Sequence, residues 1–188
     1  MSEGNLHPSF LELKTPKHPK NPKYDPDGFG EYFGRVKHGF SHIPEDAFRE
    51  WIYPFWEHAH IQKLYGNLDF RRLTFSIEVW SLAKCLSVGW YSKFDRVERI
   101  ENNWSIEDFI SAYRFNNDLV DWWLNTGTWL KPIWVLDAVS FENTNLNQDI
   151  KKPYMLIEGH SRLGALRMFN KNGRANQNNT VWTIGEIL

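Results

Sequence analysis

The 188-residue chain carries 22 basic and 23 acidic side chains, a formal net charge of −1, and 41% of its residues are hydrophobic. This length suits one folded domain, or one with an appended helical part, and the balanced charge argues against broad non-specific DNA binding. No window approaches the roughly 18 apolar residues of a membrane span, and the start of the chain lacks a secretory signal pattern. We therefore expect a cytoplasmic protein without a membrane partner.

Cys85 is the single cysteine and lies in the apolar stretch "WSLAKCLSVGW". A disulfide within the chain is excluded. A reactive thiol needs an electropositive, partly exposed setting, so this sequence predicts a buried and inert thiol.

Proline and lysine dominate the first part of the chain. Such proline density disfavours helix and favours extended backbone, so we predict an extended arm over residues 1–40, either wrapped on the surface or serving as a solvated tether. The residues that define it are Pro8, Pro16, Pro19, Pro22 and Pro26, with Lys14, Lys17, Lys20 and Lys23.

Residues 41–104 are predicted to be helical. One helix should begin near Pro44, end at Gly66 and be kinked or split by Pro54. A second is expected over about residues 72–88. This region is large enough to bind a protein partner, and we expect it to form one compact unit with residues 105–188.

A third helix begins at Ser105, where Ser105 and Asp108 have the spacing of a capping box, and it closes at Gly127. The β-branched and aromatic run "KPIWVLDAV" then predicts a strand, followed by a loop, the strand "YMLI", a short helix over about residues 161–169 and a last strand "TVWTI". Gly164 and Ala165 should let the short helix lie close to the sheet. The predicted fold class is α+β, with helices packed on a small mixed sheet.

A polar turn joins the strand "YMLI" to the short helix. In "YMLIEGHSRLGALRMF", the free N–H groups of the first helical turn favour an anion, and Gly159 lets the backbone approach a ligand closely. Ser161 offers a hydroxyl and Arg162 a planar guanidinium. We predict a phosphate-binding turn made of Gly159, His160, Ser161 and Arg162. The alternative is that Arg162 pairs with a surface carboxylate.

The order of these elements resembles the ParB/sulfiredoxin superfamily over about residues 105–187. "GTWLKPIWVL", "KPYMLIEGHSRLGALRMF" and "TVWTI" follow its sequence of helix, Pro-Ile-x-Val strand, strand running into Gly-x-x-Arg, short helix and final strand. The resemblance implies that Gly159 to Arg162 bind the phosphates of a nucleoside di- or triphosphate such as ATP. His160 stands where sulfiredoxins have their catalytic cysteine, so peroxiredoxin repair is excluded.

Two other variants of the motif narrow the resemblance. ParB proteins carry Gly-Glu-Arg-Arg at this turn and have a downstream helix-turn-helix region. This sequence has Gly-His-Ser-Arg at the turn and lacks such a region, so centromere binding is not expected. Free-standing members, amino-acid kinases among them, carry Asp-Gly-His-x-Arg, which matches Glu158, Gly159, His160 and Arg162 except that the acid is one methylene longer.

Phosphoryl chemistry fits this set of side chains. Glu158 can hold Mg²⁺ or act as a base, His160 can donate a proton, and Arg162 can stabilise developing charge. Lys131 can reach the same site, although a solvated lysine at a strand start explains it equally. The expected function is nucleotide-dependent phosphotransfer or hydrolysis. The alternatives are a non-catalytic nucleotide-sensing or protein-binding module, and a DNA-binding or nuclease domain.

Two further clusters are candidate sites. His58 and His60 are two residues apart and do not share a helix face, so they make a poor metal-binding pair. Four tryptophans can stack a nucleotide base or simply pack in the core. They are Trp122, Trp123, Trp129 and Trp134.

Overall fold

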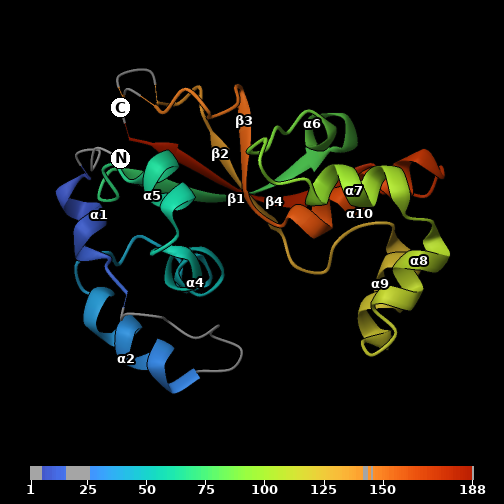
Figure 1. Ribbon diagram of the computed structural model, residues 1–188, viewed down its shortest axis with the longest axis horizontal. Coiled ribbons are helices and arrows are strands. Elements are labelled where there is room, and N and C mark those ends of the chain that lie inside the picture. The colour runs from blue at the N-terminus through green and yellow to red at the C-terminus, as the bar shows by residue number, and fades with distance from the viewer. Residues whose placement is uncertain (1–5, 16–25, 142–143, 145, 188) are drawn as a thin grey trace. The chain divides into compact units, whose positions relative to one another are not determined.

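The computed structural model describes residues 6–15, 26–141, 144 and 146–187. Helices combine with a four-stranded sheet in an α+β fold, which confirms the predicted class (Figure 1). The strands lie in the order β1-β4-β2-β3. Their bounds are Leu73–Ser81 for β1, Ile133–Asp137 for β2, Tyr154–Glu158 for β3 and Asn178–Glu186 for β4. Among the described residues, no helix combines the length and apolarity that crossing a membrane requires.

The chain divides into two compact units. Unit 1 comprises the described residues within Met1–Phe75, Asp137–Ile150 and Ile184–Leu188, and unit 2 comprises Ser76–Leu136 and Lys151–Thr183. This division differs from the predicted boundaries at residues 40 and 104, because the long strands β1 and β4 each contribute residues to both units.

Unit 1 consists of short helices around buried aromatic side chains. The helices are α1 (Pro8–Glu12), α2 (Pro26–Val36), α3 (Glu45–Ala47), the π-helical turn η1 (Phe48–Ile52), α4 (Tyr53–Phe55) and α5 (Ala59–Tyr65). The predicted interruption near Pro54 is confirmed: the backbone leaves π-helical geometry just before Pro54 and stops being helical just after it. Proline lacks the N–H that a continuous helix needs there.

The extended arm predicted for residues 1–40 is wrong where the structure describes it. α1 begins at Pro8 and α2 at Pro26. Proline is tolerated in the first turn of a helix, because an N–H at that position has no acceptor within the helix. Phe10 is buried, so α1 is anchored in the core of unit 1. The other prolines and lysines of residues 16–25 lie outside the described residues.

Unit 2 packs helices on one face of its part of the sheet. The helices are α6 (Leu82–Leu86), α7 (Arg96–Asn103), α8 (Ile106–Ala112), α9 (Asn117–Thr126) and α10 (His160–Lys171). Their core joins strand residues such as Val135 and Val181 to helix residues such as Leu163 and Phe169. Cys85 belongs to this core and is fully buried, as predicted.

The helix predicted over residues 72–88 is wrong. Leu73–Ser81 forms β1, and only Leu82–Leu86 is helical. In "LTFSIEVWS", β-branched and aromatic residues alternate with polar ones, a period-2 pattern typical of a strand. Helix α7 had not been predicted.

The third predicted helix is divided in two. Ser105 accepts a hydrogen bond from Asp108 N, and the Asp108 carboxylate accepts one from Ser105 N, which confirms the capping box. α8 nevertheless ends before Tyr113, and α9 begins anew with the Asn116 side chain accepting a hydrogen bond from Leu119 N. Gly127 closes α9 with φ 66°, as expected of a glycine C-cap.

β1 and β4 are antiparallel neighbours. In unit 1, Ile187 N donates to Arg72 O at 2.8 Å, and in unit 2, Leu82 N donates to Gln177 O at 2.8 Å. Residue numbers increase along β1 while those of the paired residues in β4 decrease, so the strands are antiparallel. Both hydrogen-bonded pairs belong to the same strand register. β1 therefore forms one end of the sheet.

Candidate functional site

The predicted phosphate-binding turn lies between β3 and α10. Gly159 has φ 101°, in the left-handed region, and forms the N-cap of α10. A Cβ added there would lie 2.5 Å from Cγ2 of Ile133 in β2. Leu163 N donates to Gly159 O at 2.8 Å, which closes the first turn of the helix. Glycine is thus required both by the backbone angle and by the closeness of β2.

Arg162 is held inside the turn. Its Nη2 donates to the carboxylate of Glu158, and its Nη1 donates to Lys131 O at 3.2 Å. Both partners of the ion pair are largely shielded, with side-chain exposures of 21% for Arg162 and 27% for Glu158. The Lys131 side chain is exposed, and its backbone carbonyl accepts the bond from Arg162. Arg162 thereby ties the end of β3 to the segment before β2.

A second arginine, which was not predicted, reaches the same turn. Arg96 is the first residue of α7, and its Nε donates to Ser161 Oγ at 2.5 Å. Arg96 is exposed to solvent. Val97 and Ile100 have helical spacing, which signals α7, but no local pattern in the sequence links Arg96 with Ser161, 65 residues away.

α7 and α10 lie side by side and run in the same direction (Figure 1). The direction follows from contacts in register along both helices: after the contact between Arg96 and Ser161, Gly164 approaches Val97 and Ile100. Further along, Arg167 and Lys171 contact Glu101 and Asn102. Gly164 therefore serves the close approach of α7, whereas the prediction assigned it to the packing of the helix on the sheet.

The two helix N-termini therefore lie together. Each N-terminus carries the equivalent of roughly half a positive elementary charge, so parallel neighbours add their potentials at the same place. Asp95 at the N-cap of α7 and Glu158 provide negative charge nearby, while Arg96 and Arg162 provide positive charge. This end of the helix pair can bind an oxyanion through backbone N–H groups, the Ser161 hydroxyl and guanidinium groups.

His160 is turned into the fold. Its ring lies edge-on to Phe94, with 5.1 Å between ring centroids, and its Nε2 is buried. The geometry favours a backbone contribution of His160 to an anion site at the start of α10.

The remaining predicted candidates do not join this turn. In unit 1, the rings of His58 and His60 are 5.3 Å apart and perpendicular, and burial together with His58 lowers the pKa of His60. No group of three or more His, Cys, Asp or Glu side chains suited to a metal ion occurs in the part of the chain that the structure describes. In unit 2, Trp123 and Trp129 are buried, while Trp122 is 39% exposed.

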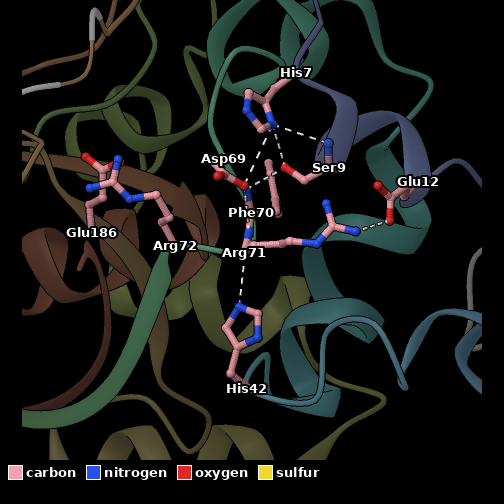
Figure 2. A network of polar contacts seen from close by, with 9 residues as sticks. All are labelled: His7, Ser9, Glu12, His42, Asp69, Phe70, Arg71, Arg72 and Glu186. Atoms are coloured by element: carbon pink, nitrogen blue, oxygen red, sulfur yellow. Dashed lines mark hydrogen bonds and ion pairs between the residues drawn. The ribbon is translucent and has the colours of Figure 1, made fainter. Parts of the chain in front are cut away.

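A serine, a histidine and an aspartate meet in unit 1 (Figure 2). His7 Nδ1 is 2.7 Å from Ser9 Oγ and 3.7 Å from Asp69 Oδ1, and Ser9 Oγ accepts a hydrogen bond from Phe70 N at 2.8 Å. In a hydrolytic triad the serine and the aspartate use different ring nitrogens. Here both face Nδ1, and Ser9 is fully buried. The cluster caps α1 and joins it to the Asp69–Phe70 turn.

A surface hollow of about 490 Å³ also lies in unit 1. It is lined by exposed Lys37, His38 and Ser41 and by the apolar residues Phe33, Phe40 and Ile43. None of these residues belongs to the predicted phosphate site.

Comparison of the chain with protein families, curated proteins and solved structures finds no match. The resemblance to the ParB/sulfiredoxin superfamily accordingly stays a prediction from the motif.

Proposed function

We propose that the protein binds the phosphate groups of a nucleotide at the shared N-terminal end of α7 and α10. The observation that supports this most directly is the hydrogen bond from Arg96 to Ser161, which places an exposed guanidinium at the first turn of α10. Arg96 uses Nε in this bond, and its side chain is exposed to solvent. A guanidinium in this position can hold two phosphate oxygens at once.

Gly159, His160 and Ser161 supply the second half of the site. Gly159 brings the backbone around so that α10 starts at the end of β3, and the first N–H groups of a helix are directed along its axis toward an incoming anion. The dipole of parallel α7 strengthens this preference for negative charge. These features recognise phosphate and leave the base and sugar unspecified, so the kind of nucleotide follows only from the superfamily resemblance.

Phosphotransfer or hydrolysis is the reaction that the resemblance implies for this site. Glu158 accepts a hydrogen bond from Arg162, so holding Mg²⁺ or accepting a proton requires that ion pair to open. A phosphate that attracts the Arg162 guanidinium would open it and release the carboxylate. Nucleotide binding and the availability of Glu158 are thereby coupled in this proposal.

Isothermal titration with pyrophosphate and with the four common ribonucleoside triphosphates, with and without Mg²⁺, tests the proposal. Arg96→Ala should weaken binding about tenfold, because a charge-assisted hydrogen bond to phosphate is lost. Arg99→Ala is the matched control, since Arg99 is exposed on the same helix one turn further on. Equal affinity of both variants, or no binding of any of these compounds, would refute the site.

Phosphate release by the wild-type protein then separates an enzyme from a sensor. Turnover that is lost in Arg162→Ala supports phosphotransfer or hydrolysis. Binding and thermal stabilisation without turnover support a nucleotide-sensing module.

A further inference from the structure

The two end strands of the sheet differ in what lies beside them. β3 is covered in unit 2 by Gly89, whose N–H donates to Tyr154 O at 3.0 Å and whose carbonyl accepts from Leu156 N at 2.7 Å. β1 occupies the other end of the sheet and is nine residues long. Within the described residues, no backbone group pairs with its outer edge in unit 2.

The register with β4 shows which groups of β1 face outward. Arg72 and Leu82 both direct a backbone group toward β4, and residues along a strand alternate in this respect. Even-numbered residues therefore pair with β4, and odd-numbered residues direct their N–H and C=O groups away from it. In unit 2, Ile77 and Val79 present this outer edge.

The side chains of the same two residues are unusually exposed for their type. Ile77 is 57% and Val79 is 71% exposed. Natural proteins usually protect an end strand with lysine, proline, a bulge or a short length. Residues 76–79 contain no lysine and no proline, so this segment combines an open backbone edge with an apolar surface.

The occupant we propose for this edge is a second copy of the same chain, with the two β1 strands pairing antiparallel about a two-fold axis at Ile77. Such an interface is self-complementary, since each copy offers the N–H and C=O groups that the other needs. The sheets of the two copies would then form one continuous sheet.

Glu78 favours a register centred on Ile77. It is the only charged residue in the segment, and Trp80 Nε1 and Lys84 already contact its carboxylate at 2.8 and 3.6 Å. A two-fold axis at Glu78 would set two carboxylates directly opposite each other, which is destabilising. An axis at Ile77 sets Glu78 opposite Ser76 of the second copy, and Ser76 Oγ is within 3.1 Å of Glu78 Oε1 within one chain. The hydroxyl can therefore donate to either carboxylate.

Sedimentation equilibrium over a wide range of protein concentration tests the pairing. The wild-type protein should approach twice the 22.3 kDa mass of the chain at high concentration. Ile77→Lys should remain at the monomer mass, because it sets two ammonium groups across the axis. A protein that stays monomeric at every concentration would overturn the proposal. So would a different protein that binds stably to the β1 edge in place of the second copy.

Phe115→Lys is the matched control. Phe115 is 89% exposed in the turn between α8 and α9, so the same gain of charge occurs on the same unit away from β1. The mass of the Phe115→Lys variant should depend on protein concentration as that of the wild type does. Equal effects of the two lysine substitutions would show that charge alone, and not the β1 edge, governs association.

Disulfide crosslinking tests the register. Mixing Ser76→Cys with Glu78→Cys protein should give mainly the mixed disulfide, since these positions face each other when the axis lies at Ile77. Buried Cys85 stays out of the reaction. Dominant pairing of Glu78→Cys with itself, or an absence of crosslinks at concentrations where the dimer mass is observed, would overturn the proposed arrangement.

Discussion

Gly159 lies so close to Ile133 that a methyl group on its Cα would come within 2.5 Å of Ile133 Cγ2. Together with φ 101°, this contact fixes glycine at the point where β3 turns into α10. The turn holds its shape through close packing of its backbone on β2, and the predictions for the anion site depend on that shape.

Gly159→Ala should destabilise unit 2 by about 2 kcal/mol or more, because the left-handed backbone and the contact with Ile133 both oppose a side chain. Gly173→Ala is the control: Gly173 also has positive φ, 67°, but nothing lies within 4 Å of the position its Cβ would take. It should cost about 1 kcal/mol. Urea unfolding measures both, and equal costs would contradict the tight contact at Gly159.

Glu158→Gln should raise the affinity for pyrophosphate several-fold, because it removes the carboxylate that competes for Arg162. Glu98→Gln removes a negative charge from the first turn of α7 and so controls for charge alone. Titration calorimetry at low salt measures both variants. An affinity for pyrophosphate that falls in Glu158→Gln would mean that Glu158 supports the anion directly, for example through a metal ion.

Stability should fall with pH above about 9 through Cys85. Burial raises the pKa of the Cys85 thiol from 9.0 to about 12, an effect that Lys84 opposes. The unfolded chain then loses the thiol proton at lower pH than the folded chain does, so the contribution is complete below pH 9 and is lost progressively up to about pH 12.

Urea unfolding at pH 8 and pH 10 measures this effect in the wild type and in Cys85→Ala. The wild type should lose more free energy of unfolding between the two values, by about 1 kcal/mol. Burial also raises the pKa values of Tyr32 and Tyr65, but both proteins retain these residues, so their contribution cancels. Parallel losses in the two proteins would contradict the assignment to Cys85.

Ser9 should not react as a nucleophile, despite its contact with His7. It is buried, and its oxygen accepts the hydrogen bond of Phe70 N. A fluorophosphonate probe should leave Ser9 unlabelled in mass spectrometry of the folded protein. Labelling at Ser9 would mean that the cluster opens and that the triad geometry forms.

The same serine should matter for stability. Ser9→Ala leaves the N–H of Phe70 without its acceptor and should cost about 1–3 kcal/mol. Ser41→Ala changes an exposed serine of the same unit and should stay within about 0.5 kcal/mol of the wild type.

Local signals in the sequence predicted the features that are themselves local. Ser105 and Asp108 form the capping box, Gly127 ends α9, and Gly159 lies in a strand-to-helix turn, each decided by neighbours within a few residues. The α+β class followed from the same kind of pattern. β1 was not predicted because the helix Leu82–Leu86 follows it directly and is also rich in apolar residues. The spacing of apolar residues changes there from a period of two to one of 3.6 residues, and no break in the sequence marks the change.

Long-range contacts explain what remained hidden in the candidate site. The turn around Arg162 was predicted from adjacent residues. The alternative was that Arg162 pairs with a surface carboxylate, and its partner in the structure is Glu158, a largely shielded carboxylate of the same turn. Arg96 reaches Ser161 only because α7 packs along α10, a relationship that depends on tertiary structure.

The way the chain builds unit 1 also governs how the protein can be dissected. Unit 1 draws on three separate stretches of chain, the last of which begins at Ile184. Dividing the chain after Phe75 would separate the first stretch of unit 1 from the two later stretches that complete this unit. Neither half of the chain should therefore fold as an independent fragment.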